Sequence, residues 1–155
     1  MRVHLNPDQA AKLATALRRA GKREAGGQLF GEQLAPAEFV VTELTVQKKR
    51  GSFARFVVDT LQAARDAVGF FNKTAHRYSR FNYVGEWHSH PSFAVHPSGC
   101  DLQTMRALVS DYSFKGNFAV LMIARLDGNI VNAKAWVFDR EGGENPVALE
   151  DVHGE

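Results

Sequence analysis

The sequence contains a single cysteine, Cys100, and this scarcity limits both its covalent chemistry and its setting. One cysteine excludes an internal disulfide, so we expect a reducing, cytoplasmic environment. It also excludes the zinc site of the nucleobase deaminases, which requires a Pro-Cys-x-x-Cys segment. Cys100 itself is expected to be a small packed residue in the first turn of a helix, and not a nucleophile.

Strong charge and long apolar runs are also lacking. The 19 basic and 17 acidic residues leave a net charge of +2, which gives little support for a nucleic-acid surface. No apolar run approaches the roughly eighteen residues that a membrane span needs, and the N-terminus has no apolar signal segment. We therefore expect a cytoplasmic protein with no membrane partner.

Hydrophobic residues make up 45% of the 155 residues, which is enough to bury a core. We expect one domain over residues 1–140. Residues 141–155 carry Glu, Gly and Pro and no clear apolar period, and are predicted to be a mobile tail. No internal repeat divides the chain.

The order of predicted helices and strands indicates an α/β fold with helices packed against a sheet. Asn6 and Pro7 begin a helix that Gly21 ends, and Asp127-Gly128 is a two-residue hairpin signal. A helix from residues 59–60 to about 78 is predicted to bury Leu61, Ala64, Ala67, Val68 and Phe71. A further helix begins at Ser98. Strands are predicted over residues 24–31, 38–46, 53–58, 82–88, 118–124 and 130–138.

The most informative segment is Glu86-Trp87-His88-Ser89-His90-Pro91, followed by Asp101. On an extended strand, residues i and i+2 point to the same face, so His88 and His90 can reach one metal ion. Asp101 falls in the first turn of the helix that follows. Two histidines and one carboxylate leave a tetrahedral zinc with one open position, which is typical of catalytic sites.

Alternative readings of the same residues stay open. Ser98-x-x-Asp101 also resembles a capping box, whose only role would be to start a helix. A hydrolase needs a general base, and Glu24, Glu32 and Glu86 are all candidates. Strand parity alone favours Glu86, because it shares the face of the two histidines, but spacing cannot choose between it and Glu24.

The segment His88-Ser89-His90-Pro91, with Ser98-Gly99-Cys100-Asp101 after six intervening residues, resembles the signature of the JAMM (MPN, Mov34) metallopeptidases. The upstream Glu24-Ala25-Gly26-Gly27 resembles that family's glutamate-bearing strand. The resemblance implies one mixed, mostly antiparallel sheet flanked by helices, in a cytidine-deaminase-like layout. It also implies one Zn²⁺ per chain held by His88, His90 and Asp101. Glu24 would be the catalytic base, and Ser98 would stabilise the oxyanion.

Members of that family cleave after the C-terminal residue of ubiquitin or ubiquitin-like proteins. The short, compact sequence is similar to bacterial members found in ubiquitin-like conjugation operons, including CBASS antiphage systems. The implied partner is the C-terminal tail of a ubiquitin-like protein, or of a conjugated cGAS-like nucleotidyltransferase. Processing of a sulfur-carrier protein, a RadC-like role in DNA metabolism and a non-catalytic MPN scaffold remain alternatives.

Three further residues are candidate substrate contacts. Trp87 and Phe93 either line the cleft or pack internally. Arg55 lies in the basic segment Gln47–Phe56, where an exposed edge strand could pair with a substrate tail. The competing reading of that segment is a solvated turn. The sequence does not indicate an oligomeric state.

Overall fold

The computed structural model describes residues 1–48 and 59–152, so the strand predicted over residues 53–58 lies outside the described residues. The elements follow one another as β1 Arg2–Leu5, α1 Pro7–Ala20, β2 Gly26–Ala35, β3 Glu38–Leu44, α2 Thr60–Lys73, β4 Phe81–Ser89, α3 Gly99–Ser110, β5 Phe118–Asp127, β6 Ile130–Asp139 and β7 Glu144–Glu150. None of these helices is long and apolar enough to span a lipid bilayer.

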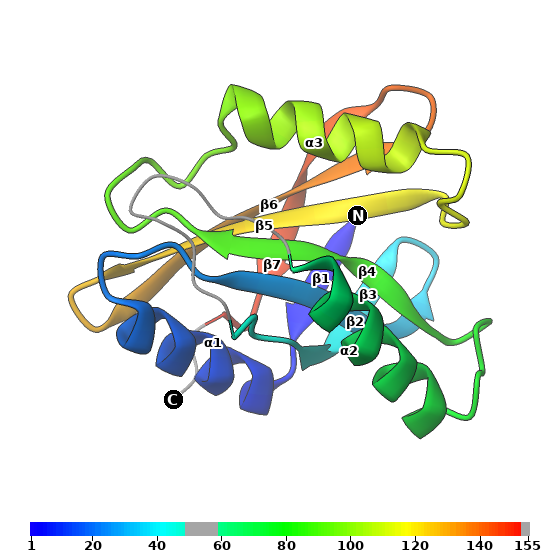
Figure 1. Ribbon diagram of the computed structural model, residues 1–155, viewed down its shortest axis with the longest axis horizontal. Helices are drawn as coiled ribbons and strands as arrows, with labels where there is room; N and C mark the ends of the chain where they lie inside the picture. Colours follow the sequence, from blue (N-terminus) through cyan, green and yellow to red (C-terminus); the bar gives the residue numbers. More distant parts are fainter. Residues whose placement is uncertain (49–58, 153–155) are drawn as a thin grey trace.

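The strands form one mixed sheet that closes on itself in the order β1-β3-β2-β4-β5-β6-β7. Four of the pairings among the described residues are antiparallel and three are parallel. Helices α1 and α3 lie on opposite sides of the sheet, and α2 lies near the N-terminal end of β4 (Figure 1). The predicted α/β fold with a mixed, mostly antiparallel sheet is confirmed.

Helix α1 forms as the sequence predicts. The Asn6 side chain accepts a hydrogen bond from the backbone N–H of Asp8, and Pro7 occupies the first helical position. Gly21 ends the helix with a φ of 59°, a conformation that favours glycine. The buried face of α1 contributes alanines and leucines, including Leu13 and Leu17, to the core.

Helix α2 differs from its prediction in length and in orientation. It ends at Lys73, because Ala75 and His76 both adopt positive φ angles and turn the chain away. Of the predicted apolar stripe, Leu61 and Val68 are about 60% exposed. The helix is anchored instead by Phe70, which is buried and stacks on Phe30 of β2 with ring centroids 4.8 Å apart; the predicted stripe is wrong.

The predicted mobile tail from residue 141 is also wrong over β7. This strand pairs in parallel with the short strand β1 and antiparallel with β6, and thereby closes the sheet. Val147 faces the core and is buried, while its neighbour Ala148 is exposed. The alternation is that of an amphipathic strand, but Pro146 and the surrounding polar residues concealed it in the sequence.

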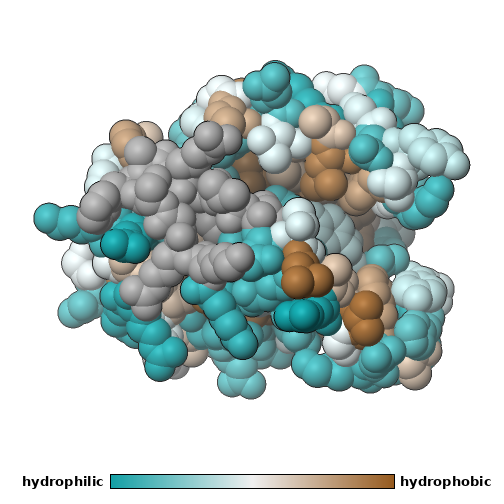
Figure 2. Space-filling view, viewed as in Figure 1, coloured by the Kyte–Doolittle hydropathy of each residue, from teal (hydrophilic) through white to brown (hydrophobic). Residues whose placement is uncertain are grey.

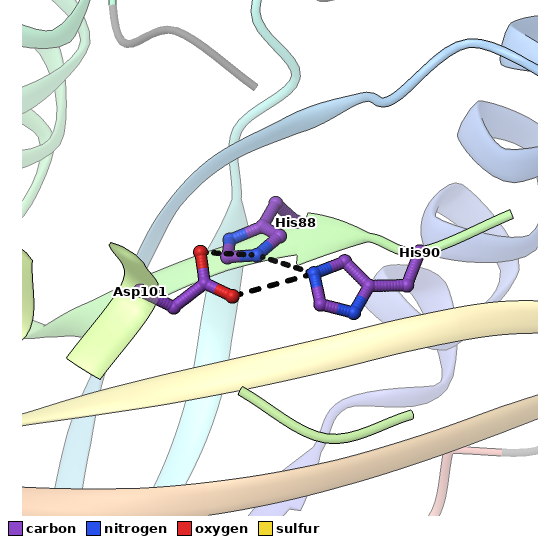
Figure 3. Close-up of side chains that lie close together, drawn as sticks. All are labelled: His88, His90 and Asp101. Carbon is purple, nitrogen blue, oxygen red and sulfur yellow. Dashed lines mark hydrogen bonds and ion pairs between the residues drawn. The ribbon is translucent and has the colours of Figure 1, made fainter. Parts of the chain in front are cut away.

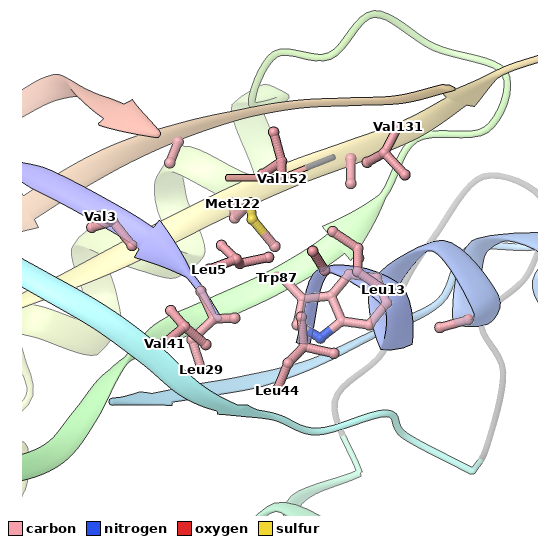
Figure 4. Packing of buried hydrophobic residues seen from close by; sticks show 14 of the residues in the cluster. Val3, Leu5, Leu13, Leu29, Val41, Leu44, Trp87, Met122, Val131 and Val152 are labelled. Carbon is pink, nitrogen blue, oxygen red and sulfur yellow. The ribbon is translucent and has the colours of Figure 1, made fainter. Parts of the chain in front are cut away.

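The core is divided by the sheet into two clusters. The larger lies between the strands and α1 and contains Trp87, which is fully buried (Figure 4). The Trp87 Nε1–H donates to the carbonyl oxygen of Thr45 at 2.8 Å, so its one polar atom is satisfied. The smaller cluster lies beneath α3, around Met105 and Phe138. Side chains of β4 that alternate with Trp87 therefore point toward α3.

Candidate metal centre

His88, His90 and Asp101 come together at the C-terminal end of β4 and the first turn of α3 (Figure 3). The Nε2 atoms of the two histidines are 3.1 Å apart. Asp101 Oδ1 lies 3.2 Å from His88 Nε2, and Oδ2 lies 3.4 Å from His90 Nε2. Both histidines are buried, so three potential ligand atoms converge at the edge of the protein interior.

These separations fit a single tetrahedral metal ion. Zinc bonds of about 2.0–2.2 Å to nitrogen and oxygen place tetrahedral ligands roughly 3.3–3.5 Å apart. The observed separations of 3.1, 3.2 and 3.4 Å match that edge length with little adjustment. Two imidazoles and one carboxylate are also a donor set that zinc accepts.

The His90 ring is held in the orientation that metal binding requires. Its Nδ1 donates to the carbonyl oxygen of Ala94 at 2.9 Å. Because a carbonyl oxygen can only accept, Nδ1 carries the proton and Nε2 keeps a lone pair directed at the other two ligands. A second-sphere contact of this kind fixes both tautomer and ring orientation at metal sites.

The charges of the three ligands are coupled. The hydrogen bond to the Asp101 carboxylate raises the pKa of His90, and the backbone carbonyl of Ala94 and the nearby charge of Glu24 act in the same direction. Partial burial opposes ionisation of Asp101, but hydrogen bonds from His88 and His90 outweigh it and hold the pKa of that carboxyl far below its usual range. Asp101 is therefore an anion ready to bind a cation.

Ser98 and Asp101 form a complete capping box at the start of α3. The Ser98 hydroxyl accepts a hydrogen bond from the Asp101 backbone N–H at 3.2 Å and donates one to Asp101 Oδ2 at 2.7 Å. The Ser98 backbone N–H also donates to Oδ2 at 2.7 Å. The two readings of this motif are compatible, because the cap that starts the helix also aims Asp101 at the histidines.

Glu24 reaches the same site through the pairing of β2 with β4. The backbone of Ala25 exchanges hydrogen bonds with Ser89: the Ala25 N–H donates to Ser89 Oγ at 2.9 Å, and the Ser89 N–H donates to the Ala25 carbonyl oxygen at 2.8 Å. Glu24 is 4% exposed and lines the cavity above the ligands. Its position fits the base predicted from the family resemblance.

The other two base candidates differ in position. Glu86 also lines the cavity; burial raises its pKa, against the opposing effects of His88 and of a hydrogen bond from Tyr83. Glu32 lies near the other end of β2, where it pairs with Arg80 at 2.5 Å. The structure thus excludes Glu32 from the site and brings both Glu24 and Glu86 to it.

A cavity of about 680 Å³ opens over the three ligands. Phe93 lines it and is 49% exposed, which is consistent with its predicted place in the cleft. Cys100 also lines the cavity and is exposed, so the prediction that it packs internally is wrong. The cavity is lined by Glu24, Glu86, His88, His90, Phe93, Ala94, His96, Pro97, Ser98, Cys100, Asp101, Thr104, Met105 and Leu121.

The two other predicted substrate contacts are Trp87 and Arg55. Trp87 has no exposed surface and faces the core on the α1 side of β4, so it does not line the cleft. Arg55 lies outside the described residues. Gln47 is described, and its N–H donates to the Gly26 carbonyl oxygen at 2.8 Å, so this part of the proposed edge is already paired with β2.

Sequence reasoning missed several residues that line the cavity, among them Thr104 and Leu121. Thr104 lies three residues after Asp101 on α3, and residues at that spacing share a helix face. The spacing alone could therefore have predicted that Thr104 lies on the same side of α3 as Asp101. Leu121 comes from β5, whose parallel pairing with β4 places it opposite Glu86; no local pattern in the sequence indicates that pairing.

Comparison with known proteins agrees with this geometry. Residues 7–139 match the family described as prokaryotic homologs of the JAB domain. A protein from Desulfitobacterium hafniense, solved in solution, is similar over 96% of this chain and 93% of its own, with 19% identity and a TM-score of 0.67. A Salinibacter ruber protein, also solved in solution, is 19% identical, with 97% and 91% of the two chains covered and a TM-score of 0.55.

A crystal structure of a JAB1/MPN domain protein from Archaeoglobus fulgidus is also similar, with 18% identity, a TM-score of 0.51, and 97% and 100% of the two chains covered. At such identities these structures support the fold alone. A comparison with curated proteins finds no significant match. The family match covers most of the sequence and includes every residue of the metal centre. The chain therefore belongs to the family of prokaryotic homologues of the JAB domain.

Proposed function

We propose that this chain is a zinc-dependent peptidase or isopeptidase that hydrolyses the bond after the C-terminal residue of a ubiquitin-like protein. The observation that carries the proposal is the convergence of His88, His90 and Asp101 at the spacing of a tetrahedral site, beneath an open cavity. A closed structural site would present a fourth protein ligand, whereas this one presents a cavity large enough for substrate.

The residues around the ligands supply the rest of the chemistry. When bound, zinc would supply Lewis acidity and lower the pKa of a coordinated water. Glu24, buried beside His90, is placed to take the proton from the attacking water and to pass it to the leaving amine. The Ser98 hydroxyl donates a hydrogen bond to Asp101 Oδ2, and by rotating it could donate instead to the substrate oxygen that gains negative charge.

The resemblance to short bacterial members of the family narrows the class of substrate. By resemblance to short members of conjugation operons, the cleaved partner is a ubiquitin-like tail or a conjugated cGAS-like nucleotidyltransferase in antiphage defence. A cavity that is open to the surface suits an extended C-terminal tail. The sulfur-carrier and RadC-like alternatives would use the same metal centre, and they differ from the proposal in substrate alone.

The test is cleavage of fusions built from the ubiquitin-like proteins encoded beside the gene, using protein loaded with one zinc per chain. Glu24→Gln is expected to retain zinc and lower kcat by about 10²–10⁴-fold, because only the base is lost. Asp101→Asn is expected to lose both zinc and cleavage. Zinc content measured by elemental analysis separates the two variants.

Two results would redirect the proposal. If Glu24→Gln cleaves normally while Glu86→Gln does not, Glu86 is the base. If the zinc-loaded protein cleaves none of the neighbouring fusions, the sulfur-carrier or DNA-linked role takes precedence. A folded protein that binds no zinc at neutral pH contradicts catalysis altogether and favours a scaffold.

A further inference from the structure

The second half of the loop that follows His90 is anchored in the core, but the first half lies at the surface. Val95 is buried in the cluster beneath α3, whereas Ser92, Phe93 and Ala94 are exposed. The position of Ala94 matters, because its carbonyl oxygen accepts the Nδ1 proton of His90. Polar contacts therefore have to hold this exposed half of the loop in the place that orients His90.

Strand β5 supplies such contacts from two consecutive residues. The carbonyl oxygen of Ala124 accepts a hydrogen bond from the His90 backbone N–H at 2.9 Å. The guanidinium of Arg125 donates through Nη1 to the carbonyl oxygen of Phe93, also at 2.9 Å. The loop is thus attached to β5 at His90 itself and again three residues later, immediately before Ala94.

The Arg125 side chain is itself held in place by the β5–β6 hairpin. Its Nε and Nη2 atoms donate to the two carboxylate oxygens of Asp127, at 2.8 and 3.3 Å. Asn132 lies opposite Arg125 in the strand pairing, and its Nδ2 donates to Asp127 Oδ2 at 3.0 Å. Residues two apart on a strand, and residues paired across strands, share one face of a sheet. The hairpin therefore fixes the guanidinium and leaves Nη1 for the loop.

These contacts distinguish Arg125 from an ordinary surface arginine. Hydrophilic side chains cover much of the face of the molecule seen in Figure 2, and an exposed ion pair by itself contributes little. Arg106, whose ion pair with Glu144 joins α3 to β7, has a side chain that is 60% exposed. The Arg125 side chain is 30% exposed and binds main chain as well as a carboxylate. The planar guanidinium, with five donors in a fixed fork, can make both contacts at once.

We propose that Arg125 is a positioning residue for the metal centre. Anchored on Asp127, its guanidinium holds the loop at Phe93. The next carbonyl group, that of Ala94, then keeps the Nε2 lone pair of His90 directed at the metal. Arg125 acts through the main chain of the loop, so its effect is on how tightly zinc is held. The inference rests on the zinc binding proposed above, and its first measurements need no cleavage.

The first measurement is zinc affinity, determined by competition with a chromophoric chelator. Arg125→Gln is expected to bind zinc about tenfold more weakly, at the lower end of the roughly 10–100-fold that outer-sphere partners of metal ligands contribute. Asp127→Asn removes the anchor and keeps the arginine, so it should lose affinity as well. Arg106→Gln, which breaks an exposed ion pair elsewhere, is the matched control, and circular dichroism verifies that each variant is folded. If Arg125→Gln or Asp127→Asn binds zinc as tightly as the wild type, or if Arg106→Gln loses as much, the proposal is overturned.

A lysine at the same position separates charge from geometry. Arg125→Lys keeps the positive charge, but its single ammonium group cannot reproduce the fork that spans the Asp127 carboxylate and the Phe93 carbonyl oxygen. We expect its zinc affinity to stay close to that of Arg125→Gln. Wild-type affinity in Arg125→Lys would mean that charge near the loop suffices, and it would rule out the positioning role.

A spectroscopic signature distinguishes positioning from general destabilisation. In zinc-loaded, ¹⁵N-labelled protein, the His90 Nδ1 proton is expected to exchange slowly with water, because a carbonyl oxygen accepts it. Arg125→Gln should broaden or remove that resonance while the backbone amides of α3 keep their protection. A His90 resonance that the substitution leaves unchanged contradicts the proposal, and so does a loss of protection that extends through α3.

Cleavage shows whether the effect reaches the reaction. With a fusion that the wild type cleaves, the zinc concentration that gives half-maximal activity of Arg125→Gln is expected to rise by the same factor as its dissociation constant for zinc. A loss of activity that excess zinc does not correct overturns the proposal. If the wild type cleaves no fusion while Arg125→Gln still binds zinc more weakly, the peptidase function fails and the positioning role stands.

Discussion

One backbone carbonyl decides how His90 can act. The Ala94 oxygen accepts the Nδ1 proton and leaves Nε2 facing His88 and Asp101. The loop between Pro91 and Pro97 thus contributes to the metal centre through its main chain. Substitution of the Ala94 side chain leaves that contact in place, whereas a change in the length of the loop would remove it.

Metal affinity is predicted to depend on the His90 proton. In the metal-free protein the Asp101 carboxylate raises the pKa of His90, so a proton occupies Nε2 at mildly acidic pH and zinc has to displace it. The pKa of Asp101 is strongly lowered, so that ligand stays ionised throughout. Apparent zinc affinity should therefore fall as pH drops below the raised His90 pKa and level off above it.

A competition titration with a chromophoric chelator, between about pH 5.5 and 8, measures this dependence. Calorimetry in buffers of different ionisation enthalpy gives the number of protons released, which we expect to approach one at the acidic end. Affinity that stays constant across the range would contradict the proton competition.

At the residue scale, the sequence was most informative about the metal ligands. Strand parity brought His88 and His90 together, and the capping box placed Asp101. The same parity puts Trp87 on the opposite face, between two residues that face the cavity. Its burial was thus predictable, and its aromatic character alone suggested a substrate contact.

At the scale of single elements, β2 depends on a close approach at Gly27. A Cβ atom added there would lie 2.1 Å from the carbonyl oxygen of Thr45, an impossible contact with main chain. Gly27→Ala is predicted to destabilise the protein by about 1–3 kcal/mol or more, because the strand has to move. Chemical denaturation measures the change, and zinc content reports whether the neighbouring site is disturbed.

Gly69 offers the matched control. It lies inside α2, and a Cβ added there meets nothing within 4 Å. Gly69→Ala is therefore expected to stabilise the protein by about 0.5–1 kcal/mol through helix propensity. If both alanines act alike, backbone contact at Gly27 is not what determines the result.

The failure of the α2 prediction has a physical cause. Apolar residues at helical spacing indicated one face, but the helix turns a mixed face inward, with Phe70 stacked on Phe30 and Gln62 bonded to the Val46 carbonyl oxygen. Phe30 belongs to β2 and Val46 follows the end of β3, so neither partner is adjacent to α2 in the sequence. Hydrophobic periodicity gives every apolar residue the same weight. It therefore does not reveal that one aromatic contact and one polar contact determine the orientation of α2.

At the scale of the whole molecule, β7 closes the sheet, and its removal tests whether residues 141–155 belong to the fold. Deleting them would leave β1 and β6 each with one unpaired edge and remove the buried Val147 from the core. We predict loss of cooperative thermal unfolding by circular dichroism. A melting temperature within about 2 °C of the full chain, which corresponds to roughly 1 kcal/mol or less, would support a dispensable tail instead.

A matched pair of point variants refines that test. Val147→Asp places a carboxylate in the core and is expected to prevent folding or lower the melting temperature by many degrees. Ala148→Asp, on the adjacent exposed position of the same strand, is expected to have little effect. Equal effects would show that β7 has no inward face. Neither β1 nor β7 was predicted, because a four-residue strand and a proline-containing strand carry too little local pattern.

The closed sheet also determines how an incoming chain can be held. Across Gly85–His88, β4 is hydrogen-bonded to β2 on one side and to β5 on the other, so the strand that carries the histidines has no unpaired edge. A substrate therefore cannot extend that strand's ladder of main-chain hydrogen bonds, which is the sequence-tolerant way of binding peptides. It has to cross over the face of β4, where the protein meets it with side chains. Discrimination between partners should then be sharp at a few positions and weak elsewhere.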